Sequence, residues 1–115
     1  MEKVTSNICK TKDIGTYGNL FGGVMLAWVD EAAGIYAMKK TGEKRMVTLR
    51  FGEVLFRKPV KVGDIVEFYC GDEKVGNSSF SFDIKAVVDG NDVFSTDCTF
   101  VAVDAKGKPK TIGKK

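Results

Sequence analysis

A long apolar segment with two acidic residues in its middle constrains the fold of this chain more than any other feature. The segment GNLFGGVMLAWVDEAAGIYAMKK covers residues 18–40 and predicts one long helix. Gly22 and Gly23 open it, and two lysines followed by Gly42 are typical of a helix C-terminus. The rest of the chain must therefore cover this helix.

The predicted helix carries small and bulky side chains on different faces. At 100° per residue, Asp30 lies on a face of mostly small residues, with bulky residues roughly opposite. The small face comprises Gly23, Leu26, Ala27, Ala33, Gly34 and Ala37, and the bulky face comprises Met25, Trp28, Ile35 and Tyr36. We expect the bulky face to pack on a sheet and the small face to allow close approach of another backbone or a ligand.

Asp30 requires an explanation, because burying an unpaired carboxylate is unfavourable. One interpretation is that Asp30 and Glu31 form a solvated stripe of the helix. The glycine pair favours another, because the N–H groups of Gly22 and Gly23 at a helix N-terminus can receive an anion or a polarised carbonyl oxygen. A carboxylate together with such an oxyanion site indicates acyl chemistry.

The spacing between these groups predicts a dimer. Gly22 and Asp30 are about 12 Å apart along a helix, so one substrate carbonyl cannot contact both in one chain. If two copies pair antiparallel through their small faces, the N-terminus of one helix meets the Asp30 region of the other.

Alternating apolar residues predict an antiparallel sheet. The expected strands are residues 2–9, 45–56, 65–70, 79–88 and 93–104, with turns at 63–64, 76–77 and 89–92. In residues 45–56 the apolar positions Val47, Leu49 and Phe51 alternate with Thr48 and Arg50, the pattern of a half-buried strand. We therefore expect an α+β domain over residues 1–115, with one helix wrapped by about five strands and a basic, solvated tail at 105–115.

Composition excludes several kinds of site. The chain contains no histidine, which excludes a catalytic triad with histidine and a histidine-containing zinc site. Cys9, Cys70 and Cys98 are too scattered for a disulfide framework or a metal site and are expected to be reduced core residues. The net charge of +3 does not indicate nucleic-acid binding. With no signal-like or membrane-spanning segment, we expect a cytoplasmic protein without a membrane partner.

Four segments together resemble one protein family. They are GNLFGGVMLAWVDEAAGIYA, RMVTLRFGEVLFRKPVKVGDIV, VGNSSFSFDI and FVAVDAKGKPK, in the family's order and with nearly its spacing. The chain is thereby similar to the hotdog-fold acyl-CoA thioesterases of the acyl-CoA hydrolase branch. This resemblance implies a hotdog fold and hydrolysis of an acyl-CoA thioester to a free carboxylic acid and coenzyme A, in fatty acid metabolism.

The resemblance assigns the catalytic roles. Asp30 would act as general base on a water or attack the thioester to give a mixed anhydride, and the sequence does not choose between the two. Gly22 and Gly23 would bind the oxyanion. Asn19 would place the thioester or the water together with Asp30 of the partner helix, although on its own sequence context Asn19 is also a plausible N-cap or turn residue.

Further residues are candidates for contacts with the coenzyme. The family positions beside the cleft are matched by Thr48, Ser78 and Ser79. The phosphates would be contacted through the charges of Arg57, Lys58, Lys106 and Lys108, although Lys58 stands where some relatives have arginine. Ordinary strand polarity and surface solubility are the alternative interpretations.

The resemblance also bears on partners and cofactors. It implies a homo-oligomer built from dimers, with a tetramer or hexamer as the larger forms, and no cofactor or metal, since coenzyme A is part of the substrate. Two alternatives use the same fold: a hotdog module that binds or senses acyl-CoA without hydrolysing it, and a purely structural assembly module.

Overall fold

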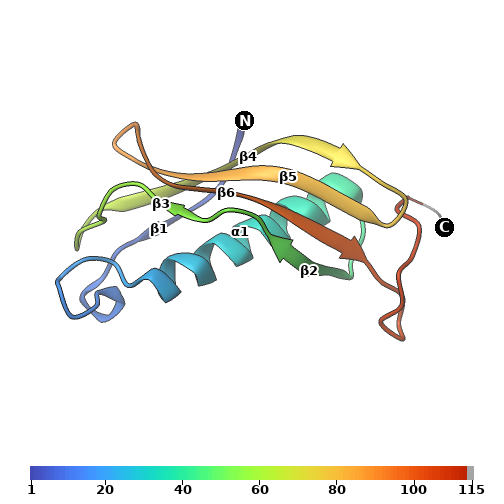
Figure 1. Ribbon diagram of the computed structural model, residues 1–115, viewed down its shortest axis with the longest axis horizontal. Coiled ribbons are helices and arrows are strands. Elements are labelled where there is room, and N and C mark those ends of the chain that lie inside the picture. Colours follow the sequence, from blue (N-terminus) through green and yellow to red (C-terminus); the bar gives the residue numbers. More distant parts are fainter. Residues whose placement is uncertain (114–115) are drawn as a thin grey trace.

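One long helix lies against a curved antiparallel sheet that covers it from one side (Figure 1). The structure is a computed structural model and describes residues 1–113. The strands are β1 (Glu2–Ile8), β2 (Met46–Phe51), β3 (Leu55–Phe56), β4 (Ile65–Val75), β5 (Ser79–Val88) and β6 (Asn91–Ala102). The helices are η1 (Thr11–Asp13), which is a short 3-10 turn, and α1 (Gly22–Thr41).

The sheet has the strand order β1-β4-β5-β6-β2, and the short β3 also pairs with β6. Hairpins join β4 to β5 and β5 to β6. β1 pairs with β4, although the helix α1 lies between these two strands in the sequence. The sequence predicted about five strands, and the sheet has six because the stretch 45–56 breaks at residues 52–54 into β2 and β3. The expected α+β architecture is confirmed.

The helix ends where the sequence predicted. Gly42 adopts a left-handed conformation with φ of 74°, and its N–H donates to the carbonyl oxygen of Met38 at 2.9 Å. The helix starts at Gly22, as the predicted opening by the glycine pair requires, with Phe21 as its N-cap residue. The interpretation of Asn19 as the N-cap is therefore wrong.

Alternate residues of the three central strands fill the core, as their two-residue period predicted. The buried positions are Val66, Phe68 and Cys70 on β4, Phe80, Phe82, Ile84 and Ala86 on β5, and Phe94, Cys98, Phe100 and Ala102 on β6. Burying one such phenylalanine stabilises the fold by about 1.5–3 kcal/mol. The core therefore depends chiefly on these strands and on the helix beneath them.

The predicted assignment of helix residues to a bulky face toward the sheet and a small face away from it was partly wrong. Ala33 and Ala37 are fully buried against the sheet, whereas Trp28 and Ile35 of the expected core face are half-buried. Aromatic rings of the sheet explain the difference, since a Cβ at Gly34 would stand only 3.8 Å from the Phe100 ring. Small helix side chains let these rings approach the helix axis.

The apolar side chains of β2 were also predicted to lie toward the core, and two of them do not. Val47 and Leu49 expose 48% and 64% of their surface. β2 is the last strand of the sheet, and its register with β6 shifts between Thr48 and Arg50. Within residues 1–113, no strand pairs with the outer edge of β2.

The basic tail is less solvated than expected. Ile112 packs against the core, and its N–H donates to the carbonyl oxygen of Asn77 at 2.8 Å. Lys110 donates through its backbone N–H to Ala102 and through its ammonium group to Glu43. The last two residues of the predicted tail, 114–115, lie outside the described part of the chain.

Within residues 1–113, no helix is long and apolar enough to cross a membrane.

Candidate active site

A hydrogen bond between α1 and β2 fixes the carboxylate singled out in the sequence. The Thr48 hydroxyl donates to Oδ1 of Asp30 at 2.7 Å. Asp30 lies on the exposed side of α1, next to the exposed residues Leu26 and Ala27. Because Thr48 holds one carboxylate oxygen, the other can accept a proton from water or attack a carbonyl carbon.

The N-terminus of α1 carries the second group. Within residues 1–113 the amide N–H groups of Gly22 and Gly23 have no acceptor, whereas those of Val24 and Met25 donate to Phe21 at 3.0 and 3.1 Å. A Cβ at Gly23 would meet the Phe21 ring at 2.9 Å, so a larger residue here would require this exposed ring to move. Two amide donors at a helix N-terminus form a site for a carbonyl oxygen that gains negative charge.

Asn19 lies just before these amides and is held from several sides. Its carbonyl oxygen accepts the Gly15 N–H at 2.8 Å, and the Leu20 N–H donates to Val60 at 2.8 Å. The Lys61 ammonium group donates to the side-chain oxygen of Asn19. The side-chain NH₂ of Asn19 thus remains available to donate to a substrate.

The sequence interpretation missed Lys61. It is separated from Asn19 by 42 positions, and only the pairing of the loop before β4 with the loop before α1 brings the two together. No local pattern signals such a contact.

One chain does not bring the two halves of the site together. Gly22 and Asp30 are eight positions apart on α1, which is about 12 Å along the helix axis. Asp30 with Thr48 and the Asn19 loop with the helix N-terminus therefore form two separate groups along α1.

The predicted coenzyme contacts lie at opposite ends of the sheet. Lys58 lies near Asn19, and Arg57 donates to the Ser95 hydroxyl at 2.9 Å. Ser78 and Ser79 lie where β5 begins, about 20 Å along this strand from Lys85, which pairs with the Ser95 that Arg57 contacts. The structure thus places the seven predicted coenzyme residues in no single cluster.

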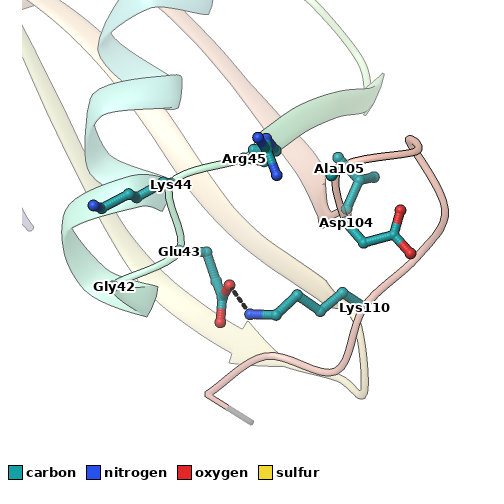
Figure 2. A pocket seen from close by; sticks show the side chains of 8 residues that line it. Gly42, Glu43, Lys44, Arg45, Asp104, Ala105 and Lys110 are labelled. Carbon is teal, nitrogen blue, oxygen red and sulfur yellow. Dashed lines mark hydrogen bonds and ion pairs between the residues drawn. The ribbon is translucent and has the colours of Figure 1, made fainter. Parts of the chain in front are cut away.

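The remaining two predicted coenzyme residues are Lys106 and Lys108, which lie in a turn after β6, beside a pocket. Their backbone N–H groups donate to Asp104 at 2.8 and 3.0 Å, while their side chains are exposed. Figure 2 shows the pocket itself, about 610 Å³ in volume, between the end of α1 and this turn.

An ion pair closes one side of this pocket. Glu43 accepts a hydrogen bond from the Lys110 ammonium group (Figure 2). A second bond, from the Gly113 N–H, is 2.8 Å long. The Lys110 contact is the main reason that the pKa of Glu43 lies below its ordinary value.

The cysteines are unsuited to nucleophilic catalysis. Cys9, Cys70 and Cys98 are free and buried, as the sequence predicted. Burial raises the pKa of Cys98 to about 12, and the nearby Asp97 and Asp30 carboxylates add to this. A thiol that stays protonated is a poor nucleophile. Residues 1–113 contain no group of three or more Cys, Asp or Glu side chains placed to hold a metal ion.

Comparison with known proteins assigns a family to this arrangement. A family model described as "Thioesterase superfamily" matches residues 17–95. An acyl-CoA thioester hydrolase of Salmonella typhimurium is 32% identical over 96% of this chain and 90% of its own length.

Solved structures agree with the sequence relatives. The hexameric thioesterase of Yersinia pestis superposes with a TM-score of 0.92 and is 31% identical, over 99% of this chain and 97% of that one. A hexameric hotdog fold thioesterase of Campylobacter jejuni gives a TM-score of 0.88 at 30% identity, over 98% and 91% of the two chains. The predicted hotdog fold is confirmed.

Proposed function

Because the chain belongs to the thioesterase superfamily and to its acyl-CoA thioester hydrolases, we propose that it hydrolyses acyl-CoA thioesters with Asp30 as the catalytic carboxylate. The products are a free carboxylic acid and coenzyme A. The observation that carries this assignment is the hydrogen bond from Thr48 to Asp30, which leaves one carboxylate oxygen exposed and oriented.

The thioester carbonyl binds at the N-terminus of α1 in this proposal. The amide N–H groups of Gly22 and Gly23 donate to the carbonyl oxygen, and the Asn19 NH₂ group donates to the same oxygen or to the attacking water. As the tetrahedral oxyanion forms, these donors stabilise its charge, and loss of one such donor commonly lowers the rate by about 10²-fold or more.

Asp30 then acts on water or on the carbonyl carbon. As a general base it takes a proton from water, whose oxygen adds to the carbonyl carbon before the thiolate of coenzyme A leaves. As a nucleophile it forms a mixed anhydride, which water opens in a second step. Hydrolysis in ¹⁸O-water under single-turnover conditions can reveal the anhydride route, since attack of water on the Asp30 carbonyl carbon leaves an oxygen of Asp30 in the product acid and places ¹⁸O in Asp30.

The site is complete only between two copies of the chain. Asp30 and Thr48 of one subunit must meet Asn19, Gly22 and Gly23 of the other, because about 12 Å separates the two groups within one helix. Exposed apolar residues support this pairing, since Leu26 is exposed on the helix that carries Asp30, and Val47 and Leu49 are exposed on β2, the last strand of the sheet. We extend the proposal to a hexamer of three such dimers, on the strength of the hexameric relatives.

The remaining coenzyme residues act across the same pairing in this proposal. Arg57 and Lys58 of one subunit approach Ser78, Ser79, Lys106 and Lys108 of the other when the two helices run antiparallel. A cytoplasmic location, a role in fatty acid metabolism and independence from a cofactor or metal stay predictions.

Mixing of two inactive variants tests the shared site. Asn19→Ala and Asp30→Ala are each expected to be folded and nearly inactive. A mixed dimer contains one doubly damaged and one intact site, so random mixing of equal amounts restores about a quarter of wild-type activity. No recovery, with subunit exchange demonstrated by mass spectrometry, would refute the shared site.

Asp30→Asn tests catalysis against simple binding. An enzyme loses hydrolysis of all acyl-CoAs in this variant while its fold and affinity for coenzyme A survive. A module that only binds acyl-CoA would show no turnover in the wild-type protein.

A further inference from the structure

A small, partly open pocket lies beside Asn19, between the start of α1 and the segment that leads into β4. Its volume is about 170 Å³. Apolar side chains make most of its wall, namely Leu20, Met25, Phe56, Val60 and Val93. It is distinct from the larger pocket at the other end of α1, with which it shares no residue.

The pocket is closed at one end and open at the other. Met25, Val60 and Val93 each expose 3% of their surface and form the closed end. Phe56 exposes 55% of its surface, and Lys58 is exposed as well, so these residues mark the mouth. A ligand group that enters through the mouth must therefore end inside the pocket.

The mouth adjoins the proposed oxyanion site. A Cβ at Gly22 would stand 3.5 Å from the Phe56 ring, and Asn19 itself lines the pocket. The Phe56 ring packs edge-to-face on the fully buried Phe94, with 5.1 Å between ring centroids, which fixes the aromatic side of the mouth. A carbonyl held by Asn19 and Gly22 therefore has one of its substituents directed at the pocket.

The chemistry of the wall selects between the two substituents of a thioester. The coenzyme side carries amides and phosphates and must continue to solvent, and its polar groups would lose their hydrogen bonds to water in this pocket. An alkyl chain is stabilised when its apolar surface is buried, and its far end needs no opening to solvent. Resting on the proposed function, we propose that this pocket holds the acyl chain and limits it to short or medium length.

The volume sets the limit. A water-sized group takes about 30 Å³ in the liquid, and a methylene group is of similar size, so the pocket holds a chain of about six carbon atoms. Longer chains must displace buried side chains or leave carbon atoms in water.

The test is a chain-length series with the full-length assembled protein. Specificity constants, kcat/KM, are measured for acetyl-, butyryl-, hexanoyl-, octanoyl-, decanoyl- and palmitoyl-CoA. The constant should rise to a maximum near hexanoyl-CoA and fall by about tenfold or more toward decanoyl-CoA. A constant that still rises at palmitoyl-CoA would overturn the proposal.

Two variants of one floor residue make the test specific. Val93→Ile fills part of the closed end and should shift the maximum to shorter chains, whereas Val93→Ala should shift it to longer ones. The readout is the ratio of kcat/KM for octanoyl-CoA to that for butyryl-CoA, in which the amount of folded protein cancels. Val87→Ile is the matched control, because Val87 is also buried but does not line the pocket.

The outcomes separate this inference from the function on which it rests. If no acyl-CoA is hydrolysed, the proposed function fails and this inference fails with it. If hydrolysis occurs but both Val93 variants keep the wild-type ratio, only the inference fails. Opposite shifts of about tenfold in the two variants, with none in Val87→Ile, support it.

Discussion

Replacement of Thr48 by valine should slow hydrolysis without weakening substrate binding. Valine keeps the shape of the side chain but removes the hydroxyl that donates to Asp30 at 2.7 Å. Without this bond the carboxylate can turn away from the partner subunit's oxyanion site. Because Asp30 acts in the transition state, the loss should appear in kcat and leave KM nearly unchanged.

The size of the effect follows from the geometry. A hydrogen bond to a charged acceptor contributes about 1.5–3 kcal/mol, and the exposure of Asp30 places this one near the lower figure. Since about 1.4 kcal/mol corresponds to tenfold in rate, kcat should fall about tenfold. Thr48→Ser keeps the hydroxyl and should restore most of the activity.

The assay is release of the coenzyme A thiol, followed with a thiol-reactive chromophore. Thr99→Val serves as the control, because the Thr99 hydroxyl also makes hydrogen bonds in the same sheet, to Ser81 and Arg50, but does not contact Asp30. This control should alter stability more than kcat. Wild-type kcat in Thr48→Val, or an equal fall in Thr99→Val, would refute the positioning role of Thr48.

Four further predictions concern other parts of the molecule. Lys61→Met should lower kcat by about threefold to tenfold, because the Asn19 side chain loses its charged donor, and Lys61→Arg should restore it in the same thiol assay. Leu49→Glu should yield a folded but inactive monomer by sedimentation, because it places a charge on the exposed apolar edge; an active monomer would contradict the shared site. The pKa of Asp83 is raised, chiefly by desolvation and also by the nearby Asp72 and Asp97 carboxylates. Ionisation of Asp83 therefore destabilises the fold as pH rises. Asp83→Asn should raise the melting temperature at pH 7 but not at pH 3. The pKa of Glu43 is lowered, so its stabilisation is complete above the ordinary glutamate pKa and disappears as pH falls through the lowered value; Glu43→Gln should destabilise the protein in calorimetry at pH 7 and much less near pH 3.

The features that the sequence predicted well are those decided by neighbouring residues. The two-residue alternation through Phe80, Phe82 and Ile84 identified a buried strand face, because a strand places every second side chain on the same side. The end of α1 at Gly42 was predictable for a similar reason, since a left-handed residue after a helix is usually glycine.

The features that it predicted poorly depend on elements distant in the chain. Ala33 and Ala37 are buried because phenylalanine rings from the sheet approach the helix there, and the helix sequence does not contain that information. The exposure of Leu49 follows from the position of β2 at the sheet edge, which is a property of the strand order. The role of Thr48 came from a family resemblance, and only the fold brings it to Asp30.

The pairing of β1 with β4 determines when the protein can fold during synthesis. Glu2 lies opposite Cys70 in the sheet, so the first strand has no partner until the ribosome has made β4. At about 5–20 residues per second, this interval lasts several seconds, and the strands that cover α1 are completed only afterwards. During that interval the apolar side of the helix is exposed on the nascent chain, and its protection from other nascent chains depends on the cell rather than on the fold.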